Sequence, residues 1–117
     1  MRNFQDFVIW QKSHSFTLKI YKITQKYPSS EAFGLTSQMR RAASSIPFNI
    51  AEGCGRHSDP DFRRFLIVAS GSASEIDYQL ILSKDLEYIS LTEFDELHFL
   101  ITEIRKMLFA LINRLGS

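Results

Sequence analysis

Residues 34–56, GLTSQMRRAASSIPFNIAEGCGR, decide the fold class of this chain. Met39, Ala42 or Ala43, Ile46 and Ile50 recur at intervals of three and four, which is the spacing of one face of an α-helix. Small residues flank this apolar face. A generic solvated helix would tolerate almost any mixture of Lys and Glu on its remaining surface. This helix instead carries a particular polar set: Arg40, Arg41, Asn49, Glu52 and Arg56.

The second helix is predicted from about residue 35 to residue 54, with Gly53 and Gly55 as its C-terminal stops. Pro47 lies inside it and lacks the N–H that would bond to the carbonyl of Ala43, so a bend is expected near Ser44 and Ser45. The bend either wraps the helix around the core or aims Asn49 and Glu52 at a partner helix.

Helical periodicity extends to both sides of this segment. The first helix is predicted over residues 5–26, and Pro28 ends it because the residue before a proline avoids the helical region. The third helix is predicted to run to about Leu86, with Asp59 as N-cap and Pro60 at its first position. Gly71, in its interior, predicts close approach of another backbone. The fourth helix is predicted to open with Thr92 and Asp95.

Four helices of similar length with short connections predict an all-α fold, an antiparallel up-down-up-down four-helix bundle that forms one domain over residues 1–117. The apolar residues outnumber the positions in a single shared interior. The surplus predicts a second buried surface, most simply a subunit interface in a homo-oligomer. Its members are Val8, Trp10, Phe48, Ile67, Val68, Phe99 and Phe109.

The central segment resembles the signature of the 23S rRNA intervening-sequence protein family, with Arg-Arg-Ala-Ala, Ser-Ile-Pro and Asn-Ile-Ala-Glu-Gly in order. Further matches are VIWQK at residues 8–12, Tyr27-Pro28, Phe65-Leu66, Gly71-Ser72 and Glu75. The resemblance implies a four-helix bundle. A related group, the accessory proteins of diversity-generating retroelements, implies pentameric rings that bind nucleic acid and a reverse transcriptase. Neither relationship implies a known reaction.

Composition places the chain among soluble, single-domain proteins. It has 117 residues, of which 44% are hydrophobic, and no window approaches the roughly 18 apolar residues of a membrane span. The single cysteine, Cys54, cannot form an internal disulfide. These features predict a soluble, unexported protein of the cytoplasm.

The net charge of +1 conceals a division along the chain. Residues 1–64 carry ten Lys or Arg against five Asp or Glu, and residues 65–117 carry four against eight, so the halves are about +5 and −4. The asymmetry fits a basic surface for a polyanion, opposite faces that attract neighbouring subunits in a ring, or plain complementarity between the two halves within one bundle.

Catalytic and metal chemistry find little support in the sequence. A di-metal bundle site needs several Glu-x-x-His motifs, and Asp95 with His98 is the only carboxylate and histidine pair at that spacing, expected on the polar side of its helix. Cys54 and His57 lie close in sequence, but a catalytic thiol also needs an oriented base and an anion-stabilising pocket. We therefore predict no enzyme activity, no cofactor and no metal.

Glu52 and Glu75 both belong to the signature and lie beside small residues that permit close helix approach. We expect them to form structural ion pairs with Arg40, Arg41 or Arg56, which would set register and assembly. A binding role for the same polar group is the alternative.

A nucleic-acid surface would rest on basic residues alone. Four lysines recur along the first helix at intervals of seven, three and four, so they share one face. Repeated around a ring, this face would hold phosphates without reading sequence, and its binding would weaken with salt. Base stacking is not predicted. The candidate nucleic-acid-binding residues are Lys12, Lys19, Lys22, Lys26, Arg40, Arg41, Arg56, Arg63 and Arg64.

The sequence therefore predicts a non-enzymatic homo-oligomer that acts as an accessory or scaffold for RNA or DNA, and the resemblance implies that the homo-oligomer is a pentamer. The structural or interface polar motif comprises Arg40, Arg41, Asn49, Glu52, Arg56 and Glu75. The alternative is a module that binds another protein and no nucleic acid.

Overall fold

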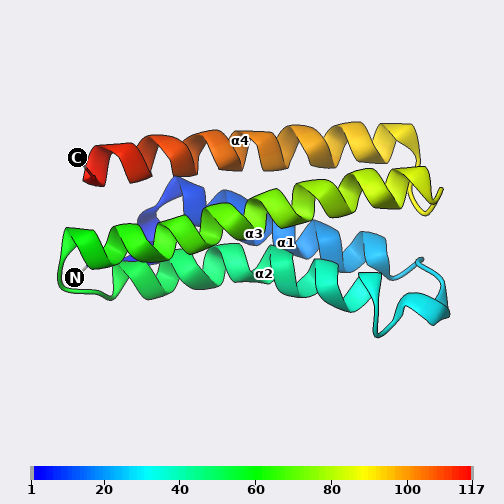
Figure 1. The fold of residues 1–117 in the computed structure, drawn as a ribbon, viewed down its shortest axis with the longest axis horizontal. Coiled ribbons are helices and arrows are strands. Elements are labelled where there is room, and N and C mark those ends of the chain that lie inside the picture. Colours follow the sequence, from blue (N-terminus) through cyan, green and yellow to red (C-terminus); the bar gives the residue numbers. More distant parts are fainter. Residues whose placement is uncertain (1, 117) are drawn as a thin grey trace.

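The computed structural model describes residues 2–116, which fold into four α-helices and two short 3-10 helices (Figure 1). No strand occurs within these residues, so the all-α class with four helices is confirmed. The α-helices are α1 (Val8–Thr24), α2 (Leu35–Cys54), α3 (Asp59–Asp85) and α4 (Leu91–Leu115), and the 3-10 helices are η1 (Phe4–Asp6) and η2 (Ser29–Glu31).

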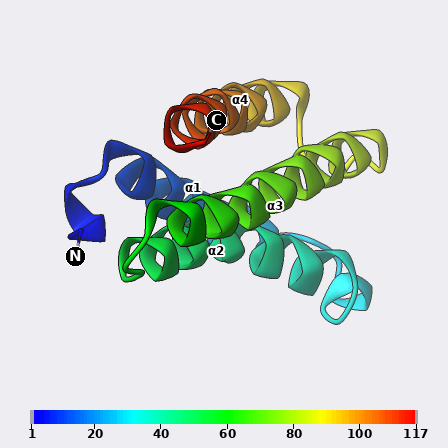
Figure 2. The same cartoon turned by 60° about the vertical axis from the view of Figure 1, so that its left-hand side comes forward.

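The four helices surround one elongated interior. Helix α2 packs against α1 and α3, and α4 packs against α3 and α1. Figure 1 shows successive helices running in alternate directions along the long axis, and Figure 2 shows the same arrangement from another side. The start of α1 and the end of α4 consequently lie at the same end of the molecule, which measures 43 × 23 × 21 Å.

One apolar face of each helix fills this interior, as the periodicity predicts. Burial of these side chains removes apolar surface from water and is the main force that holds the helices together. The largest fully buried side chains are Phe16, Ile20, Met39, Ile46, Ile50, Phe62, Leu66, Ile76, Leu80, Ile101, Ile104 and Leu108.

The first predicted helix is too long at both ends. Phe7 has extended backbone (φ −83°, ψ 123°) and separates η1 from α1, and α1 ends at Thr24. The Asn3 side chain accepts a hydrogen bond from the backbone N–H of Gln5 and so starts the separate turn. An apolar period alone could not show this break, because Phe4 and Phe7 are partly buried against the same core.

Both later N-caps are also predicted at the wrong residue. The cap of α3 is Ser58, whose Oγ accepts a hydrogen bond from the N–H of Asp61 at 3.2 Å, so Asp59 lies inside the helix. Helix α4 begins with Ser90 and Glu93, which form a complete capping box. In both cases a serine hydroxyl reaches the N3 amide, which is the geometry that favours serine at N-caps.

Pro47 lies within an unbroken and buried stretch of α2. Its missing N–H leaves the carbonyl of Ala43 without its intrahelical donor. That carbonyl instead lies 3.1 Å from the hydroxyl of Thr17 on α1, which shares its one hydrogen between this carbonyl and that of Ser13 at 2.8 Å. A side chain of the neighbouring helix therefore bonds to the carbonyl that Pro47 leaves without an N–H donor, and this bond joins α1 to α2.

Helices α2 and α3 approach closely at Gly53. A Cβ added there would lie 2.7 Å from Cδ1 of Phe62 and 3.2 Å from the Phe62 carbonyl oxygen. The approach predicted at Gly71 is not found within the chain: among the described residues, no atom lies within 4 Å of a Cβ at that position. Gly71 is exposed on the outward side of α3, away from both neighbouring helices.

Substitution of Gly53 by alanine is expected to lower the free energy of unfolding. Overpacking costs typically about 1–3 kcal/mol, which exceeds the roughly 1 kcal/mol that alanine gains in helix propensity. Gly55→Ala is the matched control, because its Cβ would make only an ordinary 3.5 Å contact. Urea unfolding at one protein concentration measures both, and a Gly53→Ala protein as stable as wild type would contradict the close packing.

The predicted surplus of apolar residues is confirmed for all but one member. Trp10 is wrongly included, because it is half-buried and packs edge-on against Phe4 with 4.9 Å between ring centroids. The others are large side chains exposed in the single chain: Val8, Phe48, Ile67, Val68, Phe99 and Phe109.

Candidate interaction surfaces

The four lysines of the predicted basic surface do share one side of α1 and of the turn that follows it, but that side faces the glutamates of α4. Three of the four form ion pairs, and residue numbers rise along α1 as they fall along α4. The pairs and their N–O distances are Lys12 with Glu103 (3.1 Å), Lys19 with Glu96 (3.6 Å) and Lys26 with Glu93 (2.5 Å). Among the described residues, no carboxylate lies within 4.0 Å of the ammonium of Lys22.

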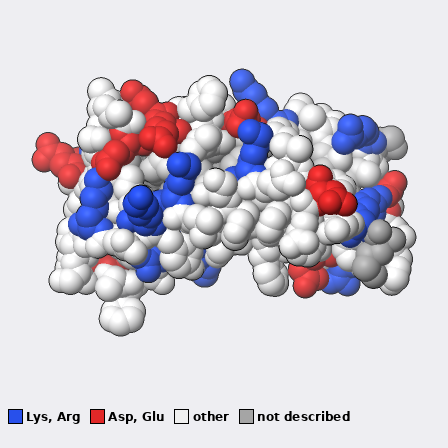
Figure 3. Space-filling model, turned by 180° about the vertical axis from the view of Figure 1, so that it is seen from behind, with Lys and Arg blue, Asp and Glu red and all other residues white. Residues whose placement is uncertain are grey.

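These pairs reduce the positive potential that the sequence suggests for this side. In Figure 3, Lys and Arg side chains lie beside Asp and Glu side chains on the face seen from behind. The paired lysine side chains stay between 41% and 49% exposed, so they remain in contact with water and salt. Complementarity between the two halves of the chain, one of the three interpretations of its charge asymmetry, accounts for Lys12, Lys19 and Lys26.

Glu93 is the most firmly held of the α4 carboxylates. The ammonium of Lys26, together with the backbone N–H of Ser90, holds the pKa of Glu93 below its usual range. Glu93 therefore completes the N-terminal cap of α4 and joins α4 to α1.

The adjacent arginines Arg40 and Arg41 have different surroundings. Arg40 donates from Nε to the Thr24 hydroxyl at 2.9 Å and from a terminal nitrogen to the Tyr21 carbonyl at 3.2 Å, and its guanidinium lies 4.8 Å from the Tyr21 ring centroid. It thereby ties α2 to the end of α1. Arg41 is exposed, and no ion pair within 4.0 Å is found for it among the described residues.

The remaining arginines of the predicted basic surface lie near the start of α3. Arg56 pairs with Glu52 at 3.2 Å and, more loosely, with Asp61 at 3.8 Å, and its guanidinium lies over the ring of Phe65. Arg64 pairs with Asp61 at 2.9 Å. Arg63 donates from Nε to the carbonyl of Ile112 at 3.0 Å and so joins α3 to the end of α4.

Of the polar signature residues, Asn49 lies at the contact between α2 and α3. Asn49 donates to the carbonyl and hydroxyl of Ser45 at 2.8 and 3.0 Å, and the Ser72 hydroxyl donates to that of Ser45 at 2.9 Å. Glu75 is exposed and, within the described residues, has a long 3.5 Å contact from Gln79 but no arginine partner. The structure thus brings Glu52 to Arg56 and leaves Glu75 apart from all three expected arginines.

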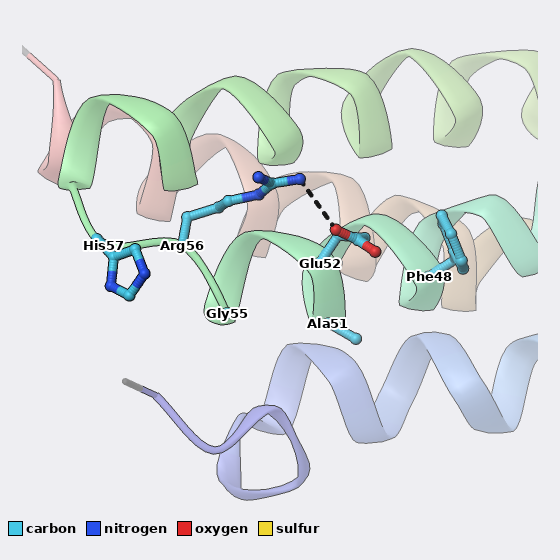
Figure 4. Close-up of a pocket in the computed structure, with 6 residues that line it drawn as sticks. All are labelled: Phe48, Ala51, Glu52, Gly55, Arg56 and His57. Carbon is cyan, nitrogen blue, oxygen red and sulfur yellow. Dashed lines mark hydrogen bonds and ion pairs between the residues drawn. The ribbon is translucent and has the colours of Figure 1, made fainter.

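A shallow hollow of about 470 Å³ opens at the C-terminal end of α2 (Figure 4). Its lining residues come from α2 and the loop that follows: Phe48, Ala51, Glu52, Gly55, Arg56 and His57. Arg56 is already bound to Glu52 on one wall, as Figure 4 shows.

Cys54 and His98, the residues considered for catalysis or metal binding, lie in surroundings that favour a structural role. Cys54 is fully buried and burial raises the pKa of its thiol, which opposes formation of the thiolate that a nucleophile needs. The partner of His98 is wrongly expected to be Asp95: Nδ1 of His98 lies 2.9 Å from Asp77 on α3. Asp77 also pairs with Arg105, also at 2.9 Å.

Two further searches cover the described residues. Within residues 2–116, no group of three or more His, Cys, Asp or Glu side chains is placed to hold a metal ion. None of the described helices is both long and apolar enough to span a membrane.

A family comparison supports the resemblance found in the signature. The family model described as 23S rRNA-intervening sequence protein matches residues 5–110. The chain belongs to this family. The match extends from η1 nearly to the end of α4, so the family is defined by the whole bundle as well as by the motif of α2.

A separate comparison with solved structures found one that is similar along almost its whole length. It is a crystal structure of a protein of unknown function from the S23 ribosomal protein family of Bacteroides thetaiotaomicron. The identity is 31%, the TM-score is 0.81, and the match covers 90% of this chain and 98% of that chain. Neither the family description nor that of this relative names an enzymatic activity. A search of curated proteins gave no match.

Proposed function

We propose that this chain is a non-enzymatic, antiparallel four-helix bundle that assembles with copies of itself and acts as an interaction scaffold. The observation that carries this proposal is the apolar surface outside the core. Phe48, Tyr78, Phe99 and Phe109 are each more than 60% exposed, although the interior is already filled. Exposed apolar surface on this scale is typical of proteins that bury it against a partner.

The two residue groups that could suggest an enzyme support a structural role instead. Cys54 is buried in the core, and His98 belongs to a bridge between α3 and α4. The absence of a disulfide-forming pair of cysteines favours the cytoplasm as the location. Five copies, the number implied by the resemblance, are the expected assembly.

Light scattering during size-exclusion chromatography tests self-assembly. We expect a mass near five times 13.5 kDa, unchanged after nuclease treatment and between about 50 and 200 mM salt, a range over which phosphate-driven association changes strongly. A nuclease-treated protein that elutes with the mass of one chain would contradict the proposal.

Nucleic-acid binding is the second candidate function. It is favoured by Lys22 and Arg41, for which no carboxylate partner is found among the described residues, and by the mention of 23S rRNA in the family description. The pairing of Lys12, Lys19 and Lys26 with α4 weakens it, because a phosphate must compete with a glutamate for each ammonium. A partner protein such as a reverse transcriptase rests on the resemblance alone.

A variant with glutamine at Lys12, Lys19, Lys22 and Lys26 separates the two candidates. If α1 binds phosphates, this variant loses salt-sensitive binding of a mixed-sequence RNA or DNA while it keeps the wild-type mass. Loss of assembly instead would make the lysine side of α1 a subunit interface. Wild-type protein that shows no mobility shift at about 50 mM salt would remove the nucleic-acid function.

A further inference from the structure

Two outward sides of the bundle differ in the charge that remains after internal pairing. The outward side of α1 and α2, here called the basic face, carries Leu18, Tyr21, Arg41 and Phe48, all exposed. Between residues 7 and 58 there are two acidic residues: Glu52, which lies four residues after Phe48 and pairs with Arg56, and Glu31. The Glu31 carboxylate accepts hydrogen bonds from the hydroxyl of Tyr88 and the N–H of Leu35, and so belongs to a separate contact.

The outward side of α3 has the opposite character. The acidic face is defined by residues that recur every three or four positions and are all exposed: Ile67, Gly71, Glu75, Tyr78, Ile81 and Asp85. The basic residues of α3 are all engaged elsewhere, since Arg63 bonds to Ile112, Arg64 pairs with Asp61, and Lys84 lies over the ring of Phe94. No cationic partner within 4.0 Å is found for Glu75 or Asp85 among the described residues.

Each face therefore combines exposed apolar side chains with charge of one sign for which no ion pair is found among the described residues, Arg41 on the basic face and Glu75 and Asp85 on the acidic face. Two basic faces would repel one another on contact, and so would two acidic faces, whereas a basic face and an acidic face attract. Because the two faces occupy different sides of one chain, every copy has one of each. Such an arrangement gives a heterologous contact, which generates a ring when the rotation closes.

We propose that copies of this chain join head to tail, with the basic face of one copy seated on the acidic face of the next and Phe48 packed over Gly71. This inference rests on the self-assembly proposed above and names the surfaces that carry it. Gly71 leaves an open position with no atom of its own chain within 4 Å of a Cβ, and Phe48 is 64% exposed. A glycine in a helix interior is less favourable than alanine, and an aromatic ring from another copy would supply the packing that the chain itself lacks.

The spacing of the two faces agrees with this contact. Arg41 and Phe48 are seven residues apart on α2, and Gly71 and Tyr78 are seven residues apart on α3. Seven residues correspond to about 10 Å along an α-helix. With Phe48 over Gly71 and the helices opposed, Arg41 reaches the neighbourhood of Tyr78 and Glu75, where it gains both a ring face and a carboxylate.

Complementary variants test the pairing. Phe48→Glu places a carboxylate on the basic face, where it would oppose Glu75, and Gly71→Gln fills the open position on the acidic face. Phe48 is exposed in the single chain and a side chain at position 71 would meet open space, so circular dichroism and thermal unfolding should show an intact fold. Thr92→Glu and Ala110→Gln are matched controls on exposed positions of α4, outside both faces.

We expect the Phe48→Glu and Gly71→Gln proteins to have the mass of one chain, and the controls to keep the wild-type mass. An equimolar mixture of the two variants should yield a species of two chains, because one intact basic face meets one intact acidic face and growth then stops. A mixture that stays at the mass of one chain overturns the head-to-tail pairing.

Other results are equally decisive. If wild type assembles and both variants keep its mass, the pairing of faces is overturned while self-assembly stands. If only Phe48→Glu is affected, the contact is a symmetric one between two α1 and α2 surfaces. If Phe48→Glu keeps its mass but loses binding of a mixed-sequence RNA, the basic face serves nucleic acid and the inference fails. A wild-type protein with the mass of one chain overturns the proposed function together with this inference.

Discussion

Replacing Phe62 with alanine is expected to lower the free energy of unfolding by about 3–5 kcal/mol, the range found for truncation of buried aromatic side chains. The ring is 1% exposed and fills the position that Gly53 leaves open between α2 and α3. It also meets Phe7 edge-on at 6.1 Å and is covered by the guanidinium of Arg2 at 4.5 Å. Removal would leave a cavity where three segments meet.

Urea unfolding of the variant at one fixed protein concentration measures this loss, since the stability of an oligomer depends on concentration. Phe33→Ala is the control, because Phe33 is 99% exposed in the connection before α2 and its truncation should change stability by no more than about 0.5 kcal/mol. Equal losses for the two variants would contradict the packing at the start of α3.

Replacing Thr17 with valine is expected to cost about 1–3 kcal/mol, although the two side chains have nearly the same shape. The Thr17 hydroxyl is the donor to the Ala43 carbonyl, which Pro47 leaves without its usual N–H. Valine keeps the volume and removes the donor, so that a buried carbonyl loses its partner. Urea unfolding again measures the effect.

A double-mutant cycle isolates the cause. Pro47→Ala restores a backbone N–H that can bond to the Ala43 carbonyl within α2, so Thr17→Val should cost less in that background than in wild type. Equal costs in the two backgrounds would show that the Thr17 hydroxyl stabilises the protein by some other contact, such as its 2.8 Å bond to the carbonyl of Ser13.

The helices and their buried faces were predictable because apolar residues at three- and four-residue spacing have few other uses. The exact helix ends were not. Asp59 and Thr92 are both acceptable caps by type, yet the hydroxyls of Ser58 and Ser90 make the bonds. The choice depends on the backbone angles just before each helix, which residue types alone do not reveal.

The candidate basic surface shows a different limit. The spacing of Lys12, Lys19 and Lys26 predicts a shared side of α1, and this is what the structure contains. Their ion partners lie on α4, between 67 and 91 residues away in sequence, because the two helices are neighbours only in the folded bundle. The excess of acidic residues in the second half of the chain was the available signal, and it favoured internal pairing without naming the pairs.

The prediction made from Gly71 concerned a close neighbour within the same chain. The helical glycine predicts a close neighbour, and none is found among the described residues of the same chain. The open position lies on the outward side of α3 beside Tyr78 and Glu75. In the proposed contact, the neighbour of Gly71 is Phe48 of another copy. Sequence alone cannot distinguish an internal neighbour from an external one.

Cysteine cross-linking is the most direct test of the central claim, that copies of the bundle meet through Phe48 and Gly71. The native Cys54 is fully buried, so new cysteines at the surface can be labelled selectively. Phe48→Cys and Gly71→Cys proteins are mixed and treated with a short bismaleimide. The account predicts covalent dimers that contain one chain of each variant, and none when either variant is treated alone. Cross-linked dimers of a single variant, or no cross-linking in the mixture, would contradict it.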